Sequence, residues 1–183
     1  VGQAFTVSAW VRPKSLTDGV FSIFYLPSGD EGEPNYQLRI QTDQVTLRLY
    51  DNEKESSVEI STTSLSGMGL EDNQWLHVVA VFDGKQSNAL EGNIDLWVNG
   101  AYKTDAQTLN LSGEFEKLRS TSHTLWIGYV PGGWFDDPGD LALGSIDRVA
   151  IIPQALSGAE IWDMYGEGCP KAWVKPMDQQ WHC

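Results

Sequence analysis

The amino-acid sequence predicts an all-β protein built as a sandwich of two antiparallel sheets. Many short segments alternate apolar and polar residues with a period of two, which is the pattern of a strand with one buried face. Turn signals separate these segments at regular intervals, as they do in sandwiches. The 183 residues include eight Trp, six Tyr and six Phe, a composition typical of strand-rich proteins.

The amino-terminal half contains five candidate strands. Residues 5–11 place four apolar side chains on one face and Thr6, Ser8 and Trp10 on the other. Pro13 ends that segment, because proline cannot donate a hydrogen bond to a neighbouring strand. A tight hairpin is predicted where two residues separate two alternating segments. The candidates are residues 5–11, 20–26, 36–40, 45–50 and 58–61, with the hairpin at Thr42-Asp43.

The carboxyl-terminal half begins with a strand that is apolar on both faces. Residues 76–82 are apolar apart from His77, which predicts a central strand covered on both sides. Asn99-Gly100 is a strong hairpin signal, because both central positions of a type I′ turn need a positive φ. The other candidate strands are residues 94–98, 101–104, 125–129 and 144–152.

One short helix is predicted near the carboxyl end. Ser157 and Glu160 form a capping box, in which Ser caps the first turn and Glu reaches back to it. Apolar residues follow at helical spacing, and Gly166 ends the predicted helix.

Two pairs of segments carry a family resemblance. The first pair is residues 74–84 and 94–100, and the second is residues 125–129 and 144–152. The most specific stretch is Gly-Ser-Ile-Asp-Arg-Val-Ala-Ile, which begins at Gly144 and leads into the capped helix. In this order and spacing the segments resemble the laminin-G-like, concanavalin A-like jelly-roll domains. The resemblance implies a jelly roll that binds sugars or proteins, often with calcium.

The predicted organisation is one laminin-G-like domain over residues 1–166, followed by a tail over residues 167–183. A disulfide between Cys169 and Cys183 would loop this tail and contribute roughly 3 kcal/mol; two free thiols are the alternative. A disulfide and the resemblance together predict a secreted protein, extracellular or at the cell surface. The sequence shows neither an initiator Met nor a signal peptide at Val1, which predicts an excised domain or a mature form.

Charge and hydropathy each argue against one class of partner: nucleic acid and the membrane interior. The formal net charge is -13, and the Lys and Arg residues are scattered, so no basic patch can neutralise nucleic-acid phosphates. No segment approaches the roughly 20 apolar residues of a membrane span, so insertion into a membrane is not expected. An acidic surface suits calcium, cationic partners or neutral glycans; solubility alone is the alternative reason for it.

Catalytic motifs are missing from the sequence. Some jelly rolls hydrolyse β-glucans with Glu-x-Asp-x-(x)-Glu on one strand, which sets two carboxylates on one face. The nearest match, Glu91 to Asp95, has no Glu beyond Asp95, and Glu91 lies in a Gly/Asn turn. His77 is expected to be a core histidine bonded to the backbone. The sequence therefore predicts a protein that is not an enzyme.

Calcium is the predicted cofactor. Three carboxylates lie within five positions in the loop over residues 134–140, and calcium binds six to eight oxygens that such loops supply. Asp147 occupies a position where the resembling family often places a residue near its metal. A solvated acidic loop is the alternative. The predicted ligands are Asp147, Asp136, Asp137 and Asp140.

Carbohydrate binding needs exposed aromatic rings, because sugars lay C–H faces on π-systems. Trp134 follows two glycines in a loop, and Tyr129 lies just before it. Trp97 and Trp126 point away from the apolar faces of their strands, as Trp10 does; for these three we expect burial under a covering strand or loop. The candidate sugar-binding residues are Trp134, Tyr129, Trp97 and Trp126.

The predicted function is a non-catalytic extracellular recognition module that binds carbohydrate in a calcium-dependent way. The alternatives are a protein-interaction or adhesion module of a larger surface protein and a glycoside hydrolase with a non-standard site. Fold resemblance alone does not choose among them, because one fold hosts many functions.

Overall fold

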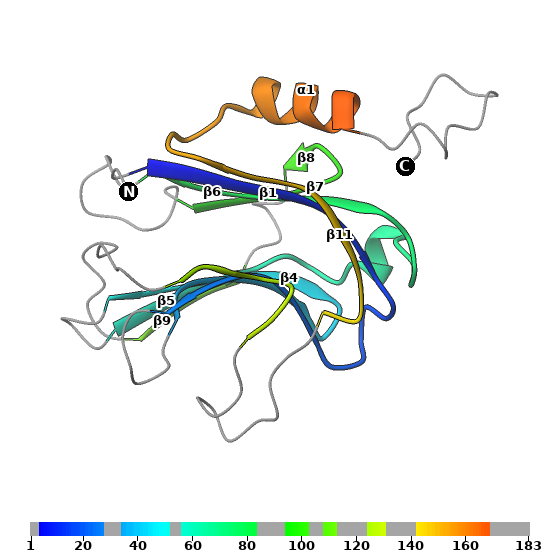
Figure 1. Cartoon of the computed structure of the whole chain (residues 1–183), viewed down its shortest axis with the longest axis horizontal. Helices are drawn as coiled ribbons and strands as arrows, with labels where there is room; N and C mark the ends of the chain where they lie inside the picture. Colours follow the sequence, from blue (N-terminus) through cyan, green and yellow to red (C-terminus); the bar gives the residue numbers. More distant parts are fainter. Residues whose placement is uncertain are drawn as a thin grey trace.

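The structure is a computed structural model that describes residues 4–27, 34–51, 56–83, 94–102, 108–112, 124–130 and 142–168. The described strands form two antiparallel sheets packed face to face, and the helix α1 covers the outer face of one of them (Figure 1). The elements are β1 (Ala4–Pro13), β2 (Val20–Pro27), β3 (Pro34–Gln41), β4 (Gln44–Asp51), β5 (Ser56–Ser61), η1 (Ser66–Met68), β6 (Leu76–Asp83), β7 (Ile94–Val98), β8 (Ala101–Tyr102), β9 (Thr108–Ser112), β10 (Trp126–Ile127), β11 (Gly144–Ile152) and α1 (Gly158–Gly168).

The two sheets have the interleaved strand order of a jelly roll, which confirms the predicted fold class. Sheet A has the order β11-β1-β6-β7-β8, and sheet B has the order β10-β2-β3-β4-β5-β9. The strand predicted to be central, β6, pairs with β1 on one side and β7 on the other. Both of its faces are buried, because one lies on the core and α1 covers the other.

The core lies between the sheets and is built from the alternating strands. Leu38 on β3 pairs directly with Leu47 on β4, and both side chains are fully buried. Each such burial contributes roughly 1.5–3 kcal/mol. The polar residues that alternate with them face away from the core. The period of two in the sequence therefore decides which residues of sheet B face the core and which face away from it.

The two predicted hairpins have the expected backbone. Thr42 and Asp43 have φ values of 48° and 64°, and Asn99 and Gly100 have φ values of 53° and 72°. All four lie in the left-handed region that type I′ turns require. Asp43 also accepts a 2.9 Å hydrogen bond from the backbone N–H of Ser66, which ties the first hairpin to η1.

The capping box at the start of α1 is confirmed. The Ser157 N–H donates to Glu160 Oε2 at 2.8 Å, and the Glu160 N–H donates to Ser157 Oγ at 3.4 Å. The helix continues to Gly168, two residues beyond the predicted end. Gly166 does not end it because its backbone stays outside the left-handed region that a glycine stop adopts.

The connection into α1 is anchored to β1. The Thr6 hydroxyl donates to the carbonyl of Gln154 at 2.8 Å and accepts the N–H of Leu156 at 3.0 Å. Ile161 and Tyr165 of α1 are buried. Sequence reasoning missed β9 and η1, and it made β10 longer than the two residues that pair with β2.

Candidate functional site

An exposed aromatic pair lies at one edge of sheet B. Trp126 on β10 pairs with Tyr25 of β2 and is 38% exposed. Its ring meets that of Tyr129 edge to face, with centroids 5.6 Å apart. The expected burial of Trp126 is wrong, because β10 lies at the edge of sheet B among the strands that the structure describes. The structure thus brings two of the predicted sugar-binding residues together at an accessible place.

A row of polar residues continues from this aromatic pair across sheet B. Residues directly opposite one another on paired strands share a face. The strand registers therefore place one residue from each of five neighbouring strands on the same face, and the core-facing residues alternate with them. The row, which we call the polar row, consists of Trp126, Tyr25, Gln37, Arg48 and Glu59. Tyr25 and Gln37 are buried, at 0% and 4% exposed, so the accessible members are Trp126, Arg48 and Glu59.

Hydrogen bonds hold the polar row in place. Arg39, two residues along β3 from Gln37 and on the same face, donates to Gln37 Oε1 at 3.2 Å. It also forms an ion pair with Glu59, with a nitrogen–oxygen distance of 3.1 Å. Side chains that are already oriented lose less freedom when a ligand binds. Sheet B is bowed, with its hollow side turned away from sheet A (Figure 1), and the polar row lies on that side.

Trp97 does not belong to this site. It lies on β7 in the other sheet, where it packs with Val79, Val81 and Ile161 beneath α1. A Cβ at Gly158 would come within 2.7 Å of its ring, so the helix lies directly on it. The structure separates Trp97 from the aromatic pair because the two sheets face in opposite directions. The expected burial of Trp10 is confirmed, with 1% of its surface exposed.

Asp147 lies on β11 at the edge of sheet A and is exposed. Its Oδ1 accepts a 2.8 Å hydrogen bond from the N–H of Arg148, so the carboxylate has a structural partner. Within the described ranges, no three His, Cys, Asp or Glu residues are close enough to hold a metal ion. The described residues alone therefore do not form a calcium site. The other predicted site residues lie outside the described residues: Trp134, Asp136, Asp137, Asp140, Cys169 and Cys183.

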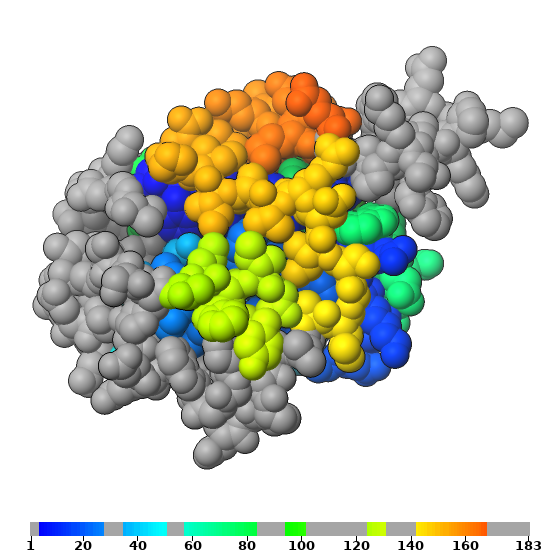
Figure 2. All heavy atoms as spheres, viewed as in Figure 1, coloured from blue at the N-terminus to red at the C-terminus, as the bar shows by residue number. Residues whose placement is uncertain are grey.

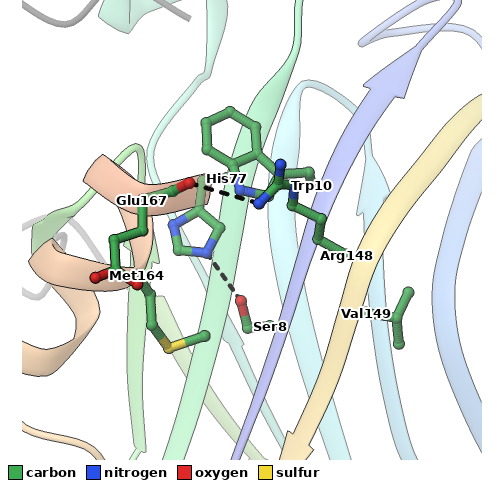
Figure 3. Close-up of a pocket in the computed structure, with 7 residues that line it drawn as sticks. All are labelled: Ser8, Trp10, His77, Arg148, Val149, Met164 and Glu167. Carbon is green, nitrogen blue, oxygen red and sulfur yellow. Dashed lines mark hydrogen bonds between the residues drawn. The ribbon is translucent and has the colours of Figure 1, made fainter. Parts of the chain in front are cut away.

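A pocket of about 330 Å³ lies on sheet A, between α1 and β11 (Figure 3). The Ser8 hydroxyl and His77 Nε2 share a buried hydrogen bond of 2.8 Å at its base. The pocket is lined by Ser8 and Trp10 of β1, His77 of β6, Arg148 and Val149 of β11, and Met164 and Glu167 of α1.

His77 lies in a stack of aromatic rings beneath α1. Its ring is stacked on Trp10 at 5.2 Å and on Tyr165 at 6.0 Å. Burial lowers the pKa of His77 to about 4, so the imidazole is neutral at neutral pH. The expected bond from its ring to the backbone is wrong: the ring bonds Ser8, and the His77 backbone N–H donates to Asn99 Oδ1 at 2.8 Å.

Sequence reasoning missed the polar row and the pocket for different reasons. The alternation over residues 36–50 marks Gln37 and Arg48 as facing away from the core, so that signal was available. The pocket had no such signal, because its residues come from four elements, of which β1 and β6 are far in the sequence from β11 and α1. Its rim also depends on an irregularity in β11 that no residue pattern announces.

The two antiparallel sheets and their strand order define the class of protein as a jelly-roll β-sandwich. A laminin G-type family model, described as the concanavalin A-like lectin/glucanases superfamily, matches residues 1–162. The chain therefore belongs to this family, which confirms the resemblance seen in the sequence.

Solved structures share the fold at low sequence identity. A heptameric SAP-like pentraxin from Limulus polyphemus is 16% identical with a TM-score of 0.57, and the match covers 89% of this chain and 70% of the pentraxin. The receptor-binding domain of botulinum neurotoxin type G is 12% identical with a TM-score of 0.56. That match covers 91% of this chain but 38% of the toxin domain, so the chain spans little more than a third of it.

A further toxin structure was solved with a protein bound. The binding domain of botulinum neurotoxin DC, in complex with rat synaptotagmin II, is 14% identical with a TM-score of 0.54. The match covers 90% of this chain and 35% of that domain. Among the described residues of the present chain, no helix has the length and hydropathy that crossing a bilayer requires.

Proposed function

We propose that this domain is a non-catalytic, extracellular carbohydrate-binding module whose glycan lies on the outer face of sheet B. The observation that carries the proposal is the position of Trp126 and Tyr129 at one end of the polar row. A sugar ring can lie on the exposed indole while its hydroxyls reach the polar side chains beyond. A binding site needs this combination of an apolar platform and a few fixed polar groups.

The polar row offers both donors and acceptors to sugar hydroxyls. Arg48 supplies guanidinium donors and Glu59 supplies carboxylate oxygens. Gln37 is buried, and its amide oxygen holds Arg39 in place beside them. Hydrogen bonds to charged groups are about twice as strong as neutral ones, so Arg48 and Glu59 would contribute most to orientation. Specificity would come from which hydroxyls match this fixed pattern.

The proposed module is a binder and not an enzyme. A glycosidase needs two carboxyl groups, roughly 5–5.5 Å apart for retention or 6.5–9.5 Å for inversion. The polar row contains one carboxylate, Glu59, and Arg39 holds it in an ion pair. Membership of the lectin-like family supports this proposal, and so do the receptor-binding domains among the proteins that share the fold.

The prediction for Trp126 uses a second exposed tryptophan as a matched control. Trp162 is 54% exposed on α1, on the opposite side of the sandwich. We expect a glycan array to identify a ligand, and Trp126→Ala to weaken its binding about tenfold or more by calorimetry, as central aromatic contacts do. Trp162→Ala should bind as the wild type does. An array without a ligand, or equal affinity for Trp126→Ala and the wild type, would contradict the proposal.

The same titration tests the proposed calcium dependence. The titration is run once with calcium and once with chelator. If Asp147 and the other predicted carboxylates hold an ion that orders the site, the protein should bind the glycan in calcium and not in chelator. Unchanged binding in chelator would remove calcium from the proposal and leave the sugar-binding face intact.

A protein-interaction or adhesion module is the second candidate function. Four exposed apolar residues favour it: Ile127 on β10, and Leu143, Val149 and Ile151 on or next to β11. Residues 124–130 and 142–152 lie side by side on one face of the molecule (Figure 2), and the Ala142 N–H donates to the Gly128 carbonyl at 2.9 Å. Exposed apolar patches of this kind mark protein contacts. If no glycan on the array binds the protein, the protein-interaction function at this apolar edge becomes the favoured proposal.

A further inference from the structure

A β-bulge places Arg148 at the rim of the pocket beneath α1. In the pairing of β1 with β11, Ser8 lies opposite Ala150 and Trp10 lies opposite Asp147. Two residues, Arg148 and Val149, therefore share the space opposite Ala9. Such bulges re-aim side chains and are found next to functional sites. The bulge changes the direction of β11 at the point where the strand meets the pocket.

The backbone of Arg148 is held in an unfavourable conformation. Its φ is +48°, in the left-handed region that costs a non-glycine residue roughly 1–2 kcal/mol. The side chain of Asp147 stabilises this backbone by accepting the Arg148 N–H at 2.8 Å. Strained residues that the surrounding structure keeps in place cluster at ligand-binding positions. The conformation matters here because it accompanies a cavity lined by the same residue.

The guanidinium of Arg148 has donors to spare for a ligand. It donates to the backbone carbonyl of Glu167 at 3.5 Å, a long and weak bond, and this is its one hydrogen bond within the described part of the chain. The Glu167 carboxylate lies on the Met164 side of the pocket, away from the guanidinium (Figure 3). A free guanidinium fork suits a carboxylate, which it can bind with two parallel bonds.

Apart from Arg148 and Glu167, the pocket is mainly apolar, with a polar pair at its base. Val149 and Met164 supply accessible apolar surface, and the buried ring of Trp10 lies behind it. The Ser8 and His77 pair closes the inner end of the pocket, because both residues are 1% exposed and bond each other. His77 Nδ1 is buried without a hydrogen-bond partner among the described residues. An unsatisfied polar atom in an apolar setting is unfavourable until a partner arrives. The volume of about 330 Å³ lies at the lower end of the range for small-molecule sites.

We infer that this pocket binds a small carboxylate that carries an apolar group, at a site distinct from the glycan face. The carboxylate lies on Arg148, the apolar group lies between Val149 and Met164, and the Ser8 hydroxyl marks the inner end. The pocket is on sheet A and the polar row is on sheet B, so experiments can test the two proposed sites independently.

The probe for this site is phenylacetate, and its amide, phenylacetamide, is the matched control without charge. We expect phenylacetate at up to about 10 mM to bind, as seen by calorimetry and ligand-observed NMR, and the amide to bind about tenfold or more weakly. Arg148→Gly should weaken phenylacetate binding by a similar factor. This variant should fold, because a φ of +48° suits glycine better than arginine.

Two further variants complete the experiment. Lys14→Ala removes the same charge from an exposed residue that does not line the pocket, and it should bind phenylacetate as the wild type does. Trp126→Ala should also bind it normally, which separates this site from the proposed glycan face. The inference is overturned if phenylacetate does not bind, if the amide binds equally well, or if Arg148→Gly keeps the wild-type affinity.

Discussion

Replacing Gly144 with alanine is expected to destabilise the domain by about 3 kcal/mol or more, because the new methyl group has no space. A Cβ at this position would come within 2.1 Å of the backbone carbonyl oxygen of Arg12 and within 2.9 Å of the Phe21 ring. The backbone oxygen belongs to β1, the strand that pairs with β11 at this point. Relief would therefore require the two strands to separate. Urea unfolding of Gly144→Ala and the wild type measures the difference.

Gly19 provides the control for the Gly144 prediction. Its φ is +75°, but a Cβ there would meet no atom within 4 Å. Gly19→Ala should therefore show only the backbone penalty of a left-handed alanine, about 1 kcal/mol. If Gly144→Ala is no less stable than Gly19→Ala, β11 does not approach β1 as closely at Gly144 as the structure indicates.

Acidification is expected to weaken the fold through His77. Burial lowers its pKa from 6.5 to about 4 in the folded protein, so the unfolded chain binds the proton more readily. The contribution of His77 to the free energy of unfolding is therefore complete above pH 6.5 and is lost as the pH falls towards 4. The difference between the two pKa values corresponds to roughly 3 kcal/mol. Urea unfolding at a series of pH values measures this loss.

His77→Gln separates this loss from other acid effects. Glutamine does not titrate, so the variant should show a nearly constant free energy of unfolding between pH 6.5 and about 4.5. Asp43 has a lowered pKa, mainly because hydrogen bonds from Ser64 and Ser66 outweigh the opposing effect of its burial. The contribution of Asp43 to the free energy of unfolding is lost only below its ordinary pKa of 3.8. This contribution is the same in His77→Gln and in the wild type. If the free energy of unfolding falls equally steeply with decreasing pH in the variant and the wild type, His77 is not the cause of the acid destabilisation.

The strands and their faces could be predicted because they depend on local pattern. Residues 36–40 and 45–50 alternate, so the side chains that meet the core and those that face away from it follow from the period of two. Asn99-Gly100 predicts its own turn because the backbone demands positive φ at both positions. The capping box before α1 is likewise contained within four neighbouring residues.

The sites could be predicted only in part because they depend on how distant strands pair. Trp126 is exposed because β10 lies at the edge of sheet B, and strand order is not written in the residues near Trp126. Trp97 has a similar local pattern, but α1 covers it. The contact between Ser8 and His77, which are 69 residues apart, exists because β1 pairs with β6. The bulge at Arg148 has no local signal at all.

The most direct test of the central claim is fluorine NMR of the protein labelled with 5-fluorotryptophan. The eight tryptophans give separate probes, which single Trp→Phe variants assign. During titration with the glycan that binds most tightly on the array, we expect the Trp126 signal to move while those of Trp10, Trp97 and Trp162 stay fixed. Movement of Trp97 or Trp162 with a stationary Trp126 signal would contradict a glycan site on sheet B.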